Sequence, residues 1–191
     1  MEESFIQEFD NSLPDMLCDE IIQMFEMEEY RYAGTTLAGV NPNIKDTTDF
    51  LIPKNDSKWT KIEECLNKEL NRCLSIYFNN VITDGTRNTL NVKHFMIQKY
   101  IKKEGKYVIH HDFMSLKNEY RVITFLWYLN DVNVGGETSF WKGKKNIIPK
   151  KGKLLLFPAS WCYAHEGKMP ISNDKYIITN WFYTKDFSKM D

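Results

Sequence analysis

The stretch Gly105-Lys-Tyr-Val-Ile-His-His-Asp112 places metal-binding residue types inside a run of β-branched and aromatic residues. Such a run favours an extended strand, in which residues two apart point to the same face. His110 and Asp112 would then meet one metal ion, whereas His111 points to the other face and is the weaker candidate. A buried carboxylate on the shared face also needs a cation beside it. We therefore interpret His110 and Asp112 as metal ligands.

A third ligand is needed, and His165 in Cys162-Tyr-Ala-His-Glu-Gly167 is the candidate. Two imidazoles and one carboxylate bind one face of a metal ion and leave other positions open, as in non-haem Fe(II) oxygenases. Zinc is a chemical alternative, because a His, Asp, His set with one open position also suits it. The remaining histidine, His94, is assigned no function, since a lone histidine in a strand is more often a hydrogen-bonded core residue.

The composition indicates a globular protein with little net charge. The 191 residues are 42% hydrophobic and 14% aromatic, which is enough for a full core in one domain. A formal net charge of −1 gives no whole-protein field that would attract nucleic acid or a membrane surface. No apolar run approaches the ~18 residues needed to span a bilayer, and the first residues have neither the basic nor the apolar region expected of a signal peptide. The cysteines lack paired metal-type spacing, so a soluble, cytoplasmic protein with free thiols is expected at Cys18, Cys65, Cys73 and Cys162.

The first half of the chain predicts helices and a long loop. A short strand is expected over residues 5–9, followed by an amphipathic helix from Pro14 to about Met27. Glycine and proline interrupt residues 31–54, which predicts a long loop that is either a functional lid or plain irregular structure. A second helix is expected over residues 57–78 with Ser57 as its N-cap. Its buried stripe would consist of Trp59, Ile62, Leu66, Leu70, Leu74 and Tyr77.

After an expected turn at residues 84–85, the hydrophobic period changes from 3.6 to 2, which is typical of strands. Six strands are expected, over residues 90–101, 107–113, 121–129, 138–141, 153–157 and 175–183. Helices followed by strands, without βα alternation, predict an α+β fold with a β-sandwich or barrel. In the last strand the odd positions from Lys175 to Tyr183 share a face that a barrel turns inward. An inward-facing lysine would need an anion, because lysine is almost never fully buried.

An ordered set of motifs runs through the second half of the chain. It comprises Tyr100, Gly105, Tyr107, His110-x-Asp112, Arg121, Thr124, Tyr128-Leu-Asn-Asp-Val132, Gly135-Gly-Glu-Thr138, Lys151-Gly-Lys-Leu-Leu-Leu-Phe157, His165-Glu-Gly167, and Lys175 with Trp181. Over about residues 95–182 this set resembles the catalytic domain of prolyl 4-hydroxylase-like 2-oxoglutarate/Fe(II) dioxygenases. The resemblance implies a single domain over residues 1–191. Its double-stranded β-helix core, of jelly-roll or cupin-like form, would span residues 89–185, after N-terminal support helices and a lid loop in residues 1–88.

The resemblance also implies a chemistry. The metal ligands would be His110, Asp112 and His165, and Lys175 would pair with the distal carboxylate of 2-oxoglutarate. Three further residues match positions that line the cosubstrate pocket, namely Tyr100, Thr138 and Trp181. Such an enzyme uses Fe(II), 2-oxoglutarate and O2, with ascorbate as a reductant, and releases succinate and CO2. Related halogenases lack the carboxylate ligand, so the presence of Asp112 favours hydroxylation.

Three functions are compatible with these residues. The leading one is hydroxylation of a peptidyl proline or a similar side chain. The alternative is a hydroxylase or demethylase of a small molecule or nucleobase, and a non-catalytic cupin-like metal-binding module is third. The lysine-rich residues 142–153 suggest nucleic acid, but such runs are usually solvated, and nucleobase demethylases of this superfamily use arginine where this chain has Lys175.

A peptide substrate would dock in a groove lined by aromatic side chains, as extended proline-rich segments do. Five aromatic residues are candidates for this lining, with ordinary packing as the alternative, and they are Tyr30, Tyr32, Trp141, Trp161 and Tyr163.

Overall fold

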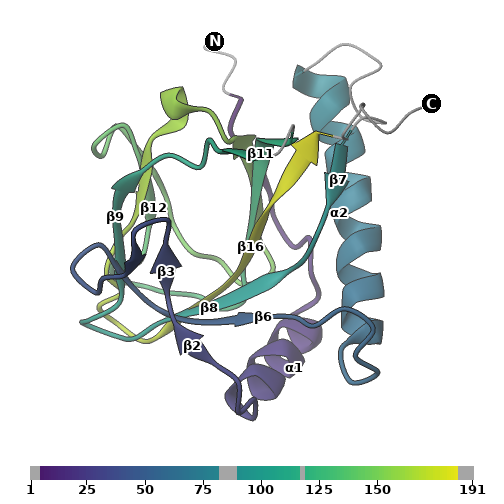
Figure 1. The fold of residues 1–191 in the computed structure, drawn as a ribbon, viewed down its shortest axis with the longest axis horizontal. Helices are drawn as coiled ribbons and strands as arrows, with labels where there is room; N and C mark the ends of the chain where they lie inside the picture. The colour runs from purple at the N-terminus through teal and green to yellow at the C-terminus, as the bar shows by residue number, and fades with distance from the viewer. Residues whose placement is uncertain (1–4, 82–89, 117–118, 185–191) are drawn as a thin grey trace.

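Two antiparallel sheets face each other in the computed structural model, which describes residues 5–81, 90–116 and 119–184 (Figure 1). Two helices cover the outer side of the larger sheet. This is the double-stranded β-helix with N-terminal helices that the resemblance implies, so the expected fold class is confirmed. The turn expected at residues 84–85 lies outside the described residues.

The larger sheet is organised around two long neighbouring strands, β11 (Glu119–Tyr128) and β16 (Lys175–Thr184). The order across this nine-stranded sheet is β1 (Gln7–Phe9), β14 (Leu154–Pro158), β11, β16, β8 (Met96–Tyr100), β6 (Thr48–Leu51) and β2 (Tyr32–Ala33), with β10 (Ser115–Leu116) on β11 and β7 (Leu90–Val92) on β16. Since β11 and β16 lie in the middle, each is hydrogen-bonded to a neighbouring strand on both edges.

The smaller sheet has five strands, in the order β13 (Lys145–Ile147), β12 (Thr138–Phe140), β15 (His165–Gly167), β9 (Lys106–His110) and β5 (Lys45–Asp46). A separate two-stranded hairpin is formed by β3 (Thr35–Thr36) and β4 (Gly39–Val40). A short 3-10 helix, η2 (Trp161–Tyr163), precedes β15. The cavity described below lies between the two sheets.

Alternation along β11 and β16 separates two regions of the protein. Phe125, Trp127 and Ile178 face outward and belong to the hydrophobic core shared with the helices. Leu126 and Ile177 face inward, toward the smaller sheet. This is the period-2 pattern of a strand buried on both faces. The expected inward face of the last strand is confirmed, because four of its odd residues line the cavity between the sheets: Lys175, Ile177, Thr179 and Trp181.

Both helices bury one apolar stripe against the larger sheet. Helix α1 (Asp15–Glu26) begins after Pro14 and buries Cys18, Ile21 and Phe25, close to the expected bounds. Helix α2 (Thr60–Val81) buries the stripe expected for it, and the first residue of that stripe, Trp59, is buried just before the helix begins. Neither helix is long and apolar enough to cross a membrane, within the described part of the chain.

The predicted N-cap of the second helix is wrong. Helix α2 begins at Thr60, and the preceding turn is held by Asp56 instead of Ser57. The Asp56 carboxylate accepts a hydrogen bond from the backbone N–H of Lys58 at 2.9 Å, and its carbonyl accepts from those of Trp59 and Thr60. Aspartate and serine are both good caps, so residue type alone did not distinguish the two neighbours.

The prediction of a long loop over residues 31–54 is also wrong. The segment contains five short strands, of which β2 and β6 join the larger sheet and β5 joins the smaller one. Each has only two to four residues. Pairing with β8 and β9 holds them in place despite weak local signals.

Other strands also differ from the predicted ones. The strand expected over residues 90–101 is interrupted between β7 and β8, and the one expected over residues 107–113 ends at His110. Strands β10, β13 and β15 were not predicted, since each has only two or three residues. The division into residues 1–88 and 89–185 stays a prediction, although β1, β2, β5 and β6 contribute to the sheets from the first part.

Replacing Leu66 by alanine tests the packing of α2 on the sheet. Leu66 is fully buried in the core, so Leu66→Ala should lower the free energy of unfolding by about 2–5 kcal/mol. Ile76 on the same helix is 37% exposed, and Ile76→Ala should cost clearly less. Urea unfolding of both variants measures the difference, and equal losses would contradict this packing.

Candidate active site

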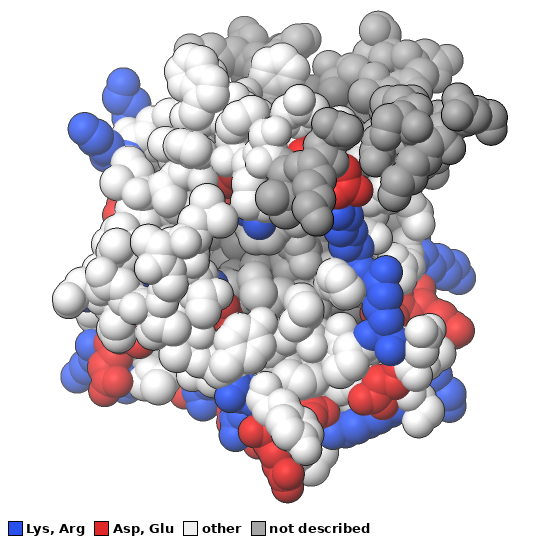
Figure 2. Space-filling model, in the orientation of Figure 1, with Lys and Arg blue, Asp and Glu red and all other residues white. Residues whose placement is uncertain are grey.

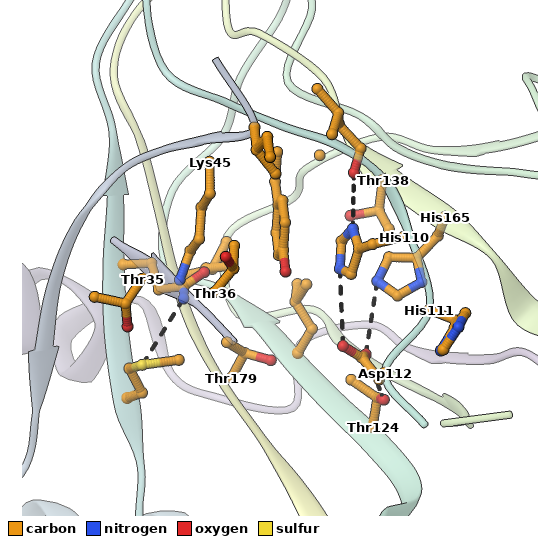
Figure 3. A pocket seen from close by; sticks show the side chains of 18 of the residues that line it. Thr35, Thr36, Lys45, His110, His111, Asp112, Thr124, Thr138, His165 and Thr179 are labelled. Atoms are coloured by element: carbon orange, nitrogen blue, oxygen red, sulfur yellow. Dashed lines mark hydrogen bonds and ion pairs between the residues drawn. The ribbon is translucent and has the colours of Figure 1, made fainter. Parts of the chain in front are cut away.

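The three predicted metal ligands converge on one point inside the cavity (Figure 3). His110 is the last residue of β9 and His165 is the first of β15, and the antiparallel pairing of these strands sets the two residues opposite each other. Asp112 follows β9 in the chain. Its carboxylate oxygens lie 3.7 Å from Nε2 of His110 and 3.7 Å from Nε2 of His165. All the potential ligand atoms lie within 4.8 Å of one another.

Asp112 reaches this point from outside the strand. The sequence predicts that residues 110 and 112 belong to one extended strand, but they do not, because β9 ends at His110. A hydrogen bond of 2.7 Å from the Thr124 hydroxyl on β11 orients the carboxylate. His111 is exposed and is not part of the ligand cluster, as expected from its position.

Backbone carbonyls set the orientation of both imidazoles. Nδ1 of His110 lies 2.8 Å from the carbonyl oxygen of Val108, and Nδ1 of His165 lies 3.0 Å from that of Tyr163. A carbonyl oxygen can only accept a hydrogen bond, so each Nδ1 carries the hydrogen. Each Nε2 then keeps its lone pair toward Asp112, which is the tautomer that binds a metal.

Aromatic rings pack against both imidazoles. The Tyr107 ring stacks on His110 with centroids 3.5 Å apart and planes 17° apart. The rings of Phe140 and Phe157 lie 5.4 Å and 4.9 Å from that of His165. These contacts restrict ring rotation, so the side chains are held in place before any ligand arrives.

The protonation states of the cluster suit a metal. Burial and the neighbouring His165 lower the pKa of His110 to about 4, so this imidazole is neutral at pH 7. Burial would raise the pKa of the Asp112 carboxyl, but His165, His110 and the Thr124 hydroxyl lower it below its usual range. A neutral imidazole beside an ionised carboxylate is the form that divalent cations bind. Two nitrogen donors and one oxygen donor fit Fe(II), and they fit zinc as well.

Lys175 is a buried cationic side chain that lacks an acidic partner. Only 1% of it is exposed, and no carboxylate among the described residues forms an ion pair with it. Its Nζ donates to the Gly136 carbonyl at 3.0 Å and lies 3.9 Å from the centre of the Tyr100 ring. Burial lowers its pKa to about 7. A buried amine with one hydrogen bond leaves donor capacity for an anion in the same cavity.

The cavity that contains these groups has a volume of about 590 Å³ and reaches both sheets. Tyr100, Thr138 and Trp181 line it, and their predicted place beside 2-oxoglutarate stays a prediction. The Thr138 hydroxyl accepts a 2.6 Å hydrogen bond from the buried Tyr128 hydroxyl. Gly167 leaves room next to Tyr100, because a Cβ at this glycine would lie 3.2 Å from the tyrosine ring.

Arg121 lines the cavity, although no function was predicted for it from the sequence. Its guanidinium carbon lies 3.3 Å above the centre of the Trp181 ring, a close cation–π stack. Nε of Arg121 is buried and has no hydrogen-bond partner among the described residues. The sequence places Arg121 near the start of a predicted strand, but the stack on Trp181 depends on the β11–β16 register.

Five aromatic candidates for a substrate groove do not line this cavity, so this prediction is wrong for Tyr30, Tyr32, Trp141, Trp161 and Tyr163. The aromatic lining consists of Tyr100, Tyr107, Phe113 and Trp181 instead. Trp141 packs on Tyr163, with ring centroids 5.8 Å apart, outside the lining. Aromatic residue type alone does not reveal which side of a turn faces the cavity.

Ion pairs neutralise part of the lysine-rich region. Lys151 lies 2.6 Å from Asp19, and Lys153 lies 2.6 Å from Glu8. The region is therefore less cationic than its sequence suggests.

His94 borders a separate small polar pocket away from the ligand cluster.

Comparisons with known proteins agree with this geometry. The family model of the 2OG-Fe(II) oxygenase superfamily matches residues 95–183. A protein of Acanthamoeba polyphaga mimivirus named "Putative prolyl 4-hydroxylase" is 25% identical over 190 residues, covering 90% of this chain and 71% of the relative.

Solved structures share the fold. A viral collagen prolyl hydroxylase from Paramecium bursaria Chlorella virus-1, in complex with 2OG, superposes with a TM-score of 0.72 at 19% identity, covering 95% of this chain and 97% of the other. A prolyl hydroxylase from Trichoplax adhaerens, in complex with a hypoxia inducible factor peptide, gives 0.71 at 21% identity, covering 95% and 84%.

Metal titration tests the ligand cluster. The protein should bind one divalent cation, and His110→Ala, Asp112→Ala and His165→Ala should each weaken or abolish this binding, because each removes one of three donors. The matched control is His111→Ala, which removes a neighbouring exposed imidazole and should leave the metal affinity unchanged. Calorimetry with Fe(II) under nitrogen, or with Co(II), measures the affinities. A loss in His111→Ala with retention in His110→Ala would contradict the assignment.

Proposed function

We propose that this chain is a prolyl 4-hydroxylase-like member of the 2OG-Fe(II) oxygenase superfamily, and that it hydroxylates a prolyl residue, or a similar side chain, in a polypeptide. The observation that carries this proposal is the placement of a His, Asp, His cluster and an unpaired buried lysine in one cavity. Fe(II) would be the resident metal, and 2-oxoglutarate and O2 the cosubstrates.

The cavity residues fit both groups. His110, Asp112 and His165 would hold the metal from one side and leave its other positions open. Lys175 would bind the distal carboxylate of 2-oxoglutarate, which supplies the missing counter-ion for its ammonium group. Tyr100, Thr138 and Gly167 would surround this cosubstrate. With both bound, the metal centre supplies an oxidant that inserts one oxygen atom into a C–H bond, while 2-oxoglutarate leaves as succinate and CO2.

The remaining cavity suits a peptide group. Arg121 is held flat against Trp181, so its donors can reach a carbonyl oxygen without ordering a flexible side chain. A peptidyl proline is followed by such a carbonyl and presents an apolar ring that can pack on aromatic side chains. The volume of about 590 Å³ is in the range of ligand-binding clefts and gives room for substrate beside the cosubstrate.

Ascorbate as a reductant and a cytoplasmic location are further parts of this proposal.

Replacing Lys175 tests the cosubstrate site. Lys175→Ala should raise the KM for 2-oxoglutarate roughly ten- to hundredfold, since a charge-assisted hydrogen bond contributes ~1.5–3 kcal/mol and ~1.4 kcal/mol is a factor of ten. Lys144→Ala, which removes an exposed lysine after β12, is the control and should leave this KM unchanged. Succinate formation measures both, and normal saturation of Lys175→Ala would refute the role.

The same residue should make 2-oxoglutarate binding depend on pH. Only the cationic form of Lys175 attracts the carboxylate of 2-oxoglutarate. The pKa of Lys175 in the free protein is about 7, so the affinity for 2-oxoglutarate should fall as the pH rises above 7. An unfolded lysine keeps its proton up to about pH 10, so the unfolded state binds more protons between these values. The free energy of unfolding should therefore rise with pH over that range. Lys175→Ala should lack both pH dependences. Calorimetry measures the affinity for 2-oxoglutarate, and chemical denaturation measures the free energy of unfolding.

Product analysis tests the substrate class. Proline-containing peptides incubated with enzyme, Fe(II), 2-oxoglutarate and ascorbate should gain the mass of one oxygen atom on proline. Succinate should form in proportion. The Asp112→Ala variant is the negative control, because it lacks the carboxylate ligand. Oxidation of a free amino acid or a methylated nucleotide, with no oxidised peptide across a broad set, would assign the enzyme to the small-molecule or nucleobase class.

A further inference from the structure

The hairpin of β3 and β4 is held firmly at both of its ends. Before it, β2 pairs with β6, and the backbone N–H of Gly34 donates to the Thr47 carbonyl at 2.8 Å. After it, β5 pairs with β9, and the backbone N–H of Val108 donates to the Ile44 carbonyl at 2.9 Å. The hairpin is thus attached to one sheet on each side.

A buried ion pair reinforces this attachment. Nζ of Lys45 lies 2.6 Å from the Asp49 carboxylate, and both side chains are less than 5% exposed. The Thr47 hydroxyl donates to the other Asp49 oxygen at 2.7 Å. Since the two charges neutralise each other inside the cavity wall, they leave no net charge for a ligand. Figure 3 shows Lys45 across the cavity from His110 and His165.

The tip of the hairpin has no such support. Strands β3 and β4 pair only with each other among the described strands. The tip is closed by a hydrogen bond from the Thr36 hydroxyl to the Gly39 carbonyl, with Gly39 at φ 94°. Leu37 at this tip is 92% exposed, although it borders the cavity.

Two further apolar side chains border the cavity mouth. Ile109 and Phe113 are each 45% exposed, and they are the chain neighbours of the candidate ligands His110 and Asp112. We call Leu37, Ile109 and Phe113 the apolar lip. Two of the three lip residues, Ile109 and Phe113, therefore adjoin the candidate ligands through the backbone. In Figure 2 the surface beside the central hollow is almost free of charged side chains on the side of β3 and β9, whereas Lys and Arg side chains lie on the opposite side.

We propose that the apolar lip binds an apolar residue that neighbours the hydroxylated residue in a polypeptide substrate. This inference rests on the proposed function and adds a sequence preference to it. Continuity with the cavity identifies the occupant, because a chain that presents one residue to the metal site must pass over its rim. An extended polypeptide advances at most ~3.6 Å per residue, so the neighbours of the target residue reach the rim first.

The charge distribution selects the chemistry of the occupant. Exposed apolar groups adjoining a ligand cleft mark interaction sites, and burial against an apolar side chain is favourable. A nucleic acid backbone would bind the Lys and Arg side chains on the opposite side of the hollow, whereas the lip offers only apolar contact. An acidic or basic residue at the neighbouring position would lose hydration without gaining a partner.

A specificity switch tests this proposal. A set of peptides should be identical except for the residue before the target proline, which is leucine, glycine, aspartate or lysine. The wild-type enzyme should favour leucine in kcat/KM. Leu37→Asp should lower the value for the leucine peptide about ten- to hundredfold and raise the value for the lysine peptide relative to the others. Leu37→Lys should shift the preference toward aspartate.

The matched control is Val40→Asp. Val40 belongs to the same hairpin and is 58% exposed, but it does not border the cavity. This variant should keep the wild-type order of preference, and the melting temperature of each variant checks that it is folded.

Four outcomes would overturn the inference. Equal rates for all four peptides, or an unchanged preference in Leu37→Asp, would refute the apolar lip while leaving prolyl hydroxylation intact. No hydroxylated peptide, with active turnover of 2-oxoglutarate, would refute both the proposed function and the lip. Oxidation of an oligonucleotide that Leu37→Asp impairs would show that the lip binds nucleic acid.

Discussion

The pairing of β11 with β16 is the constraint on which the rest of the structure depends. Seven pairs of residues align these strands in the middle of the larger sheet, with one irregularity near Arg121. A shift of β16 by one residue would move Lys175 and Thr179 into the helix-facing core, and the same shift of β11 would move Phe125 and Trp127 into the cavity. The hydrophobic core against α1 and α2 prevents such a shift. The helices therefore maintain the inward face of the site without contacting its ligands.

Sequence periodicity identified the residues whose position depends on one strand. Lys175 lies on the inward face because alternation in a ten-residue strand leaves little ambiguity. The buried stripe of α2 was equally clear, since it extends over five turns. His165 could be proposed as a ligand from residue type and resemblance, but its place opposite His110 depends on the pairing of two short strands, one of them unpredicted.

The misassigned segment over residues 31–54 shows a different limit. Its strands have so few residues that local preference for an extended chain is weak, and their structure comes from partners far away in sequence. The Lys45–Asp49 pair looks in the sequence like two exposed charges four residues apart. Only the folded chain shows that the pair is buried. Arg121 is a similar case, because its role depends on the ring of a residue sixty positions later.

The hydrogen bonds at Nδ1 of His110 and His165 determine which amino-acid substitutions this site can tolerate. Both acceptors are main-chain carbonyls located two residues earlier in the same segment, at Val108 and Tyr163. No single side-chain replacement elsewhere can delete a main-chain oxygen. The choice of tautomer is thus encoded in the local path of the backbone, and residues around the imidazoles can diverge while the nitrogen that meets the metal stays the same. Only a change that redirects the chain just before each histidine would remove this control.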